Sequence, residues 1–255
     1  MSNRRDEVLG LLGVERWVPR SAAPVVPAAP DVSPQPLIAT APLQPLATAN
    51  PISVMTPPVL PVATQFTPSA DWDELRAQVA NCMRCKLCKT RTKTVFGVGN
   101  AAAPLMVVGE GPGADEDASG EPFVGRAGKL LDEMLRAIDR SRADNVFIAN
   151  VVKCRPPGNR DPEKDEVEAC RNYLDAQIAH VKPRLIVALG RIAAQRLLTT
   201  EEPLSRLRGP LHQYGLSKTP VFVTYHPAYL LRSPKEKAKS WEDLKKIAQH
   251  LQAHG

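Results

Sequence analysis

Short apolar runs alternate with amphipathic segments over the later part of the chain. The runs are rich in Val, Ile and Leu and lack polar alternation, which predicts buried strands over Leu105–Gly109, Val146–Val152, Leu185–Leu189 and Val221–Tyr225. Apolar residues spaced three or four apart predict helices over Trp72–Ala80, Arg126–Ile138, Glu163–His180, Arg191–Leu198 and Ser240–Gln252. We therefore predict the α/β class: a three-layer α/β/α domain with a central, mostly parallel four-stranded sheet.

Chemically distinctive residues follow each predicted strand directly. Glu110 comes after the first strand, Asn150 lies at the end of the second, and Gly190 and His226 follow the third and fourth. The carboxyl ends of parallel strands meet at one edge of a sheet, and ligands bind at that edge. We therefore expect these residues to share one site.

The segment after the first strand is rich in glycine and acids. It reads GEGPGADED from Gly109 and continues as GEPFVGRAG to Gly128. Glycine lets a backbone approach a flat ligand closely, so we expect the amides around Gly111 and Gly113 to face a substrate. A phosphate cradle is disfavoured, because no Gly-Lys-Ser/Thr ending follows and the acids would repel nucleotide phosphates.

Composition separates the N-terminal part from the rest. Between Pro19 and Pro68 lie 13 of the 25 prolines and no glycine, and Asp31 is the only charged residue between Ser21 and Ala70. Such a segment buries too little apolar surface to offset the entropy of ordering it. We predict a docking peptide over residues 1–20, a disordered Pro/Ala-rich linker over residues 21–70, and one folded domain over residues 71–255.

Net charge and the search for targeting signals bear on the binding partner and the cellular compartment. The formal net charge of +6 suits a polyanionic partner. The chain has no apolar run long enough to span a membrane and no secretory signal, so we expect a cytoplasmic protein, and we expect it to be a monomer. In a reducing compartment cysteines serve metal binding or catalysis more often than disulfides.

The five cysteines are arranged like metal ligands. Cys82 and Cys85 form a Cys-x2-Cys pair, and Cys154 and Cys170 lie 16 residues apart, so four thiolates are present for zinc or an iron–sulfur cluster. Cys88 offers a second pairing with Cys85, and buried free thiols are a third alternative. Spacing alone leaves zinc and iron–sulfur equally open.

Four ordered features resemble family 4 uracil-DNA glycosylases. They are the run GEGPGADED…GEPFVGRAGKLLDEML, the run NVVKCRPPGNRDP, the late HPAYLLR and the cysteine spacing, and together they cover nearly all of residues 80–245. The resemblance implies hydrolysis of the bond between uracil and deoxyribose in DNA. It also implies a [4Fe–4S] cluster, whose ligands would be Cys82, Cys85, Cys154 and Cys170, with Cys88 as a spare thiol.

The resemblance assigns three side chains to the uracil. Phe123 would stack on a base extruded from the DNA. Asn150 would read the Watson–Crick edge, since its carbonyl can accept from N3–H while its amide donates to O4, a pattern that cytosine reverses. His226 would stabilise the negative charge that develops at O2 of the departing base.

Water activation falls to the acids of the glycine-rich segment. We assign Glu110 to the attacking water and to the developing sugar cation. Glu116 and Asp117 are second candidates, and Glu116 would also crowd the C5 edge and exclude thymine. Asn159 matches a family position near the water.

Five arginines flank the predicted strand ends, and we expect them to contact DNA phosphates. They are Arg155, Arg160, Arg191, Arg208 and Arg232. A related group that crosslinks to the abasic product carries a Lys-Arg-Arg-Ile-His loop. Here the corresponding segment reads RLRGPLH from Arg206 to His212, which favours ordinary turnover.

The first residues resemble the N-terminal peptide of the psi subunit of the bacterial clamp loader. The shared features are Arg4-Arg5-Asp6, a Leu-Gly followed by a β-branched residue, and Trp17 with Arg20. The resemblance implies that residues 1–20 tether the protein to the clamp loader.

Two other functions remain open at this point. The same domain could act on another deaminated base such as hypoxanthine, or the chain could be a non-catalytic iron–sulfur accessory protein that binds DNA. The joint presence of Glu110, Asn150 and His226 argues against the accessory protein, because a binding module needs no group to stabilise a leaving base.

Overall fold

The computed structural model describes residues 66–253. The predicted docking peptide, and the predicted linker as far as residue 65, lie outside the described residues. Phe66 packs against Tyr173, with ring centroids 5.1 Å apart, and the Arg84 guanidinium lies 4.1 Å from the centre of the Phe66 ring. Phe66, which the prediction assigned to the linker, therefore contacts the folded domain.

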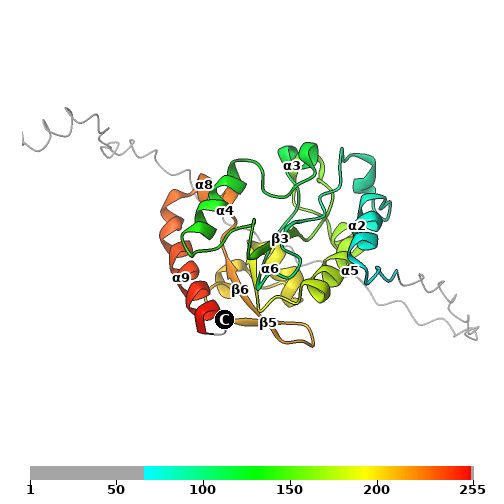
Figure 1. Ribbon diagram of the computed structural model, residues 1–255. Helices are drawn as coiled ribbons and strands as arrows, with labels where there is room; N and C mark the ends of the chain where they lie inside the picture. Colours follow the sequence, from blue (N-terminus) through cyan, green and yellow to red (C-terminus); the bar gives the residue numbers. More distant parts are fainter. Residues whose placement is uncertain (1–65, 254–255) are drawn as a thin grey trace, which may run out of the picture. The chain divides into compact units, whose positions relative to one another are not determined.

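One mixed sheet lies at the centre of the described part of the chain (Figure 1). Its strand order is β1-β3-β2-β4-β6-β5, with β2, β3, β4 and β6 parallel and the two edge strands antiparallel. The bounds are β1 (Val98–Gly99), β2 (Leu105–Gly109), β3 (Val146–Asn150), β4 (Leu185–Leu189), β5 (His212–Tyr214) and β6 (Thr219–Thr224).

The prediction of a four-stranded sheet was wrong in its count, because six strands pair here. The four predicted strands form its parallel centre, and the two edge strands were not predicted. β1 has only two residues, one of them glycine, and β5 has three residues that are partly or fully exposed. Neither carries the continuous apolar run that marks a buried strand.

The helices and helical turns cover the sheet. Their bounds are α2 (Trp72–Ala80), η1 (Lys86–Lys89), α3 (Ala114–Ser119), α4 (Arg126–Arg136), η2 (Pro157–Asn159), α5 (Lys164–Val181), α6 (Arg191–Leu198), α7 (Leu204–Leu207), α8 (Pro227–Arg232), η3 (Pro234–Glu236) and α9 (Lys237–Ala253). The five predicted helices are all present, with ends shifted by at most a few residues, whereas the short α3, α7 and α8 were not predicted. Within residues 66–253, no helix is long and apolar enough to cross a membrane.

Strand β2 shows why the domain has three layers. Leu105 and Val107 belong to the core shared with α4 and α9, whereas Met106 and Val108 belong to the core shared with α2, α5 and α6. In Figure 1 these two groups of helices lie on opposite sides of the sheet. The strand is buried on both faces, which explains its unbroken apolar sequence.

The parallel pairing brings the predicted site residues to one edge. Gly109 at the end of β2 pairs with Asn150 at the end of β3, and the Gly190 amide donates to the Thr224 carbonyl at 2.9 Å. The chain continues past β3 in contact with β2, since the Val152 amide donates to the Glu110 carbonyl at 3.1 Å. The carboxyl ends of the parallel strands therefore converge, as the sequence predicted.

Candidate active site

A cavity of about 370 Å³ lies at the carboxyl edge of the sheet. Its walls come from the segment after β2, the end of β3, the loop that follows β3, and α8. The lining includes all eight residues predicted to be catalytic or uracil-binding: Glu110, Gly111, Gly113, Glu116, Phe123, Asn150, Asn159 and His226. The fold brings them together, and their individual roles stay predictions.

Phe123 is held in an unusual backbone conformation at the cavity. Its φ of +56° is left-handed, which is rare for a bulky side chain. Arg142 donates to the carbonyls of Pro122 at 3.0 Å and Phe123 at 2.9 Å. A Cβ on Gly128 would lie 1.8 Å from the Phe123 carbonyl oxygen, so only glycine permits this contact. The surrounding structure thus over-determines the strained residue, a pattern that clusters at functional sites.

Asn150 presents an unpaired polar atom in the interior. The residue is 2% exposed, and its Oδ1 accepts no hydrogen bond from any described residue. A Cβ on Gly109 would lie 2.4 Å from this oxygen and 2.6 Å from Cζ of Phe123, so glycine is required for the close approach. Because an unpaired buried acceptor is costly, a ligand N–H is the partner that this geometry suits.

His226 caps α8 in a way that selects one tautomer. Its Nδ1 accepts from the Ala228 amide at 3.2 Å, which puts the proton of a neutral ring on Nε2. Burial, the largest cause, and Arg232 lower the pKa of His226 to about 4, and Glu116 acts in the opposite direction. At neutral pH the ring is therefore an uncharged donor, and its centre lies 5.6 Å from that of Phe123.

Glu110 faces a second carboxyl in the cavity. Burial, the largest cause, and the neighbouring Asp161 carboxylate raise the pKa of Glu110 to about 7, and Arg191 acts in the opposite direction. Asp161 is itself fixed by Arg191, whose Nη2 lies 2.5 Å from its Oδ2. Near neutral pH the Glu110 carboxyl is thus poised between its protonated and ionised forms.

The Glu116 carboxylate accepts hydrogen bonds from three backbone amides. Its Oε2 accepts from Gly113 at 3.0 Å, and its Oε1 accepts from Val124 at 3.0 Å and Gly125 at 3.1 Å. The carboxylate therefore ties the two ends of the segment between β2 and α4 together. Asp117 lies outside the cavity lining: it is buried and accepts from the Thr92 amide at 2.9 Å.

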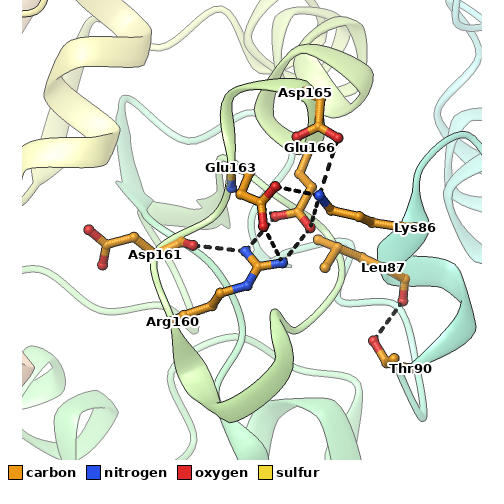
Figure 2. Close-up of polar contacts among 8 residues, drawn as sticks. All are labelled: Lys86, Leu87, Thr90, Arg160, Asp161, Glu163, Asp165 and Glu166. Atoms are coloured by element: carbon orange, nitrogen blue, oxygen red, sulfur yellow. Dashed lines mark hydrogen bonds and ion pairs between the residues drawn. The ribbon is translucent and has the colours of Figure 1, made fainter.

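The loop after β3 is anchored by an ion-pair network (Figure 2). Arg160 makes two hydrogen bonds to the buried Glu166 carboxylate, at 2.7 and 2.8 Å, and a third to the Asp161 carbonyl at 2.9 Å. Lys86, which lies in the cysteine-bearing segment, forms an ion pair with Glu163. The network thus joins the segment that holds Cys85 and Cys88 to the loop that holds Asp161.

The other predicted phosphate-binding arginines have varied surroundings. Arg208 pairs with Asp243 at 2.7 Å, and Nε of Arg155 donates to Oδ1 of Asn159 at 2.7 Å. Arg232 lines the cavity and is exposed, and its side chain makes no hydrogen bond or ion pair with any residue from 66 to 253. Arg232 is therefore the most readily accessible of the five for an outside anion.

All five cysteines line a second, smaller cavity. Cys154 and Cys170 are buried, and Cys82, Cys85 and Cys88 are partly buried. Three cationic side chains, Arg84, Arg91 and Lys153, share the lining, and Nη1 of Arg91 lies 3.1 Å from the Cys154 sulfur. In the described residues, no three His, Cys, Asp or Glu side chains are grouped so as to hold a single metal ion.

Residues 96–246, more than half of the chain, match the family described as the uracil DNA glycosylase superfamily. The chain belongs to this superfamily. A type-4 uracil-DNA glycosylase of Archaeoglobus fulgidus is 45% identical over 184 residues, which cover 69% of this chain and 92% of the relative. A second, from Thermotoga maritima, is 42% identical over 182 residues, covering 70% and 93%. A type-5 enzyme of Pyrobaculum aerophilum is 28% identical over 199 residues, covering 66% and 88%.

The predicted resemblance to type-4 uracil-DNA glycosylases is thereby confirmed. Three residues at this cavity were not predicted: Asp161 and Tyr229, which line it, and Arg142, which donates to the Phe123 carbonyl. Asp161 stands two residues after Asn159 in the NRDP run, so its place beside a predicted site residue was the available signal. Arg142 lies in a polar turn, and its sequence gives no comparable signal.

Proposed function

We propose that this chain is a uracil-DNA glycosylase, which hydrolyses the bond between uracil and deoxyribose and leaves an abasic site in DNA. Membership of the superfamily and the two type-4 relatives support this activity. The observation that carries the proposal is the buried, unpaired Oδ1 of Asn150 at the wall of a base-sized cavity. Uracil supplies the N–H donor that this oxygen lacks.

Base recognition combines a stacking face with an edge reader. An extruded uracil would lie on Phe123, a contact that contributes about 1–3 kcal/mol without distinguishing one base from another. Asn150 would accept from N3–H and donate to O4. Cytosine presents an acceptor at N3 and a donor at C4, so it would leave both Asn150 groups unpaired inside the protein.

Departure of the base requires stabilisation of negative charge. As the C–N bond breaks, the electron pair moves onto the uracil, and O2 becomes a stronger acceptor. The neutral His226 ring would donate its Nε2–H to that oxygen. A neutral donor avoids the cost of burying an imidazolium, which agrees with the lowered pKa of His226.

Water addition completes the reaction. We assign ionised Glu110 to the oxocarbenium-like sugar and to the water, with Asp161 beside it as a second carboxyl. The water adds its oxygen to C1′ of the sugar and gives up a proton to the carboxyl pair or to the departing base. Asn159, on the same wall, is a candidate for holding this water.

Glu116 has a positioning role in this proposal. Three amide donors occupy its carboxylate, which leaves it poorly placed to take a proton from water. Its position in the cavity lining is compatible with a contact at the C5 edge, where a thymine methyl group would clash. Glu116 would thus set the shape of the uracil site.

The cysteine cavity fits an iron–sulfur cluster by its donor set. Thiolates are the usual ligands of such clusters, and the surrounding arginines and lysine would balance their negative charge. We assign Cys82, Cys85, Cys154 and Cys170 as ligands of a [4Fe–4S] cluster, with Cys88 as a neighbouring thiol. The bound cluster would crosslink the segment around Cys82 to the loop after β3, and the proposed reaction uses no chemistry from it.

DNA binding would combine this cavity with arginines at its rim. Arg155 and Arg232 are the best placed for phosphates, because Arg160, Arg191 and Arg208 already pair with carboxylates. Contacts of this kind are independent of sequence and weaken with salt. We also propose that residues 1–20 tether the chain to a clamp loader, on the resemblance of that peptide alone. Unchanged retention of a Trp17→Ala variant on purified clamp loader would contradict the tether.

Base release from defined oligonucleotides tests the proposed activity. Separate strands would contain uracil, thymine, hypoxanthine or cytosine at one position, and released base and strand cleavage at abasic sites would be measured. We expect release of uracil alone, and its loss in Asn150→Ala. Release of hypoxanthine in preference to uracil would favour the second substrate, and DNA binding without any base release would favour an accessory protein.

A further inference from the structure

Lys153 is a lysine buried between the cysteine cavity and Asn150. It is 1% exposed, and its Nζ donates to the Asn150 carbonyl at 2.8 Å and to Oε1 of Gln177 at 2.6 Å. Both acceptors are neutral, and no carboxylate among residues 66–253 forms an ion pair with this ammonium. A buried charge without a counter-charge is strongly unfavourable, so negative charge nearby would stabilise this ammonium.

The cysteine cavity would supply that negative charge. Lys153 lines it together with all five cysteines, and its backbone amide lies 3.4 Å from the Cys170 sulfur. Cysteine binds metals as the thiolate, so an occupied site would place several negative charges in the cavity that Lys153 lines. The lysine and the ligand set therefore compensate each other.

The same ammonium fixes the end of β3. Asn150 is the last residue of that strand, and its carbonyl is held by Lys153. Gln177 extends the contact, because its Nε2 donates to the Phe96 carbonyl at 2.8 Å. This buried chain of hydrogen bonds fixes the backbone from which Asn150 reaches the uracil cavity.

We propose that Lys153 is a positioning residue that links the cysteine site to base reading. Its ammonium is one of the counter-charges of the thiolates, beside Arg84 and Arg91, and it also supports Asn150. The inference rests on the proposed function, because it concerns how Asn150 is held for uracil. It predicts that removing this one charge disturbs two sites that share no ligand.

Lys153→Met in the full-length chain tests the link, since methionine is similar in length but lacks both the charge and the donors. Iron bound per chain after loading with iron and sulfide is one readout, and the single-turnover rate constant for uracil release is the other. We expect each to fall by about tenfold or more, the range found when outer partners of metal ligands are removed. Lys245→Met, which removes one charge from an exposed pair with Glu242, should change neither.

The outcomes separate clearly. A folded Lys153→Met variant in which either readout stays native overturns the link. Where Lys153→Met does not fold, Lys153→Arg carries the test, because arginine keeps the charge but changes the contacts: native iron content with slowed uracil release supports the proposal, and any other combination overturns it. If the native chain releases no uracil, the proposed function fails instead, and iron content alone decides whether Lys153 is a counter-charge.

Discussion

Replacing Asp161 by asparagine is expected to let uracil release continue at lower pH than in the native chain. The Asp161 carboxylate adds to the effect of burial in raising the pKa of Glu110 from an ordinary value of 4.5 to about 7. Asparagine has the same size and no charge, so it removes this repulsion. It also frees Arg191 from its 2.5 Å ion pair, and the guanidinium then favours ionised Glu110 more strongly. Both changes favour the carboxylate.

The size of the effect follows from the titration of Glu110. If ionised Glu110 acts on the sugar and the water, half of the native molecules are active at the pKa of about 7. Below that point the active fraction falls about tenfold for each pH unit. Asp161→Asn should therefore retain several-fold more of its plateau rate than the native chain at about one pH unit below neutrality. Burial is the larger cause of the raised pKa, so part of the shift will remain in the variant.

Single-turnover release of uracil from a labelled oligonucleotide, with protein in excess, measures this directly across the pH range. DNA affinity is measured at each pH, so that changes in binding are separated from changes in the rate constant. Glu110→Gln is the matched control: its rate should be low, and the rate should not fall further toward acid pH, a fall that we call the acid limb of the pH–rate profile. An acid limb at the same pH in native chain and Asp161→Asn would refute the carboxyl pair. A Glu110→Gln variant that keeps the native rate, beside a Glu116→Gln variant that loses it, would reverse the two roles.

Three further predictions concern the same cavity. Glu110→Gln should stabilise the fold by about 1–2 kcal/mol at alkaline pH, after allowance for the partial exposure of Glu110. The pKa of Glu110 is higher in the folded chain than its ordinary value, so the native chain loses stability as pH rises from 4.5 through about 7. Thermal unfolding across this pH range measures the effect, and the variant should show no gain below pH 4.5. Glu116→Gln should lower the free energy of unfolding by about 1–3 kcal/mol and slow uracil release, because an amide offers one acceptor where three backbone donors need two; denaturant unfolding checks it, and an unchanged midpoint would contradict it. Asn150→Ala should slow uracil release by about a hundredfold or more at native DNA affinity, and a small loss would show that another group reads the base.

The centre of the fold could be predicted from local sequence because its strands are buried on both faces. Val107 and its neighbours in β2 have no polar alternation, and the same pattern identified the other parallel strands. Once those strands are parallel, their carboxyl ends must share an edge, so the convergence of Glu110, Asn150 and His226 followed from topology. The edge strands could not be found this way, since β1 and β5 are short and partly exposed.

The details of the site depend on contacts that sequence does not display. The left-handed backbone of Phe123 is fixed by Arg142, which comes 19 residues later, and by the missing side chain of Gly128. The loop that carries Asp161 is anchored through Arg160 to Glu166. The Arg142 contact joins residues 19 apart and the Arg160–Glu166 pair joins residues six apart, and neither pairing follows from the local pattern, so the motif identified the residues but not their partners.

The two acids of the glycine-rich segment show how such contacts set a role. Glu110 and Glu116 lie six residues apart, line one cavity, and are equally suited by type to act on water. The Glu116 carboxylate accepts hydrogen bonds from three backbone amides, which fix its position in the segment. Glu110 is largely buried and lies beside the Asp161 carboxyl, and both raise its pKa, which is about 7. Glu110 can therefore exchange a proton near neutral pH. A carboxyl group that acts on water needs the environment of Glu110, whereas a carboxylate that fixes backbone needs that of Glu116, and this difference is our reason for proposing Glu110 as the reacting residue and Glu116 as the positioning residue.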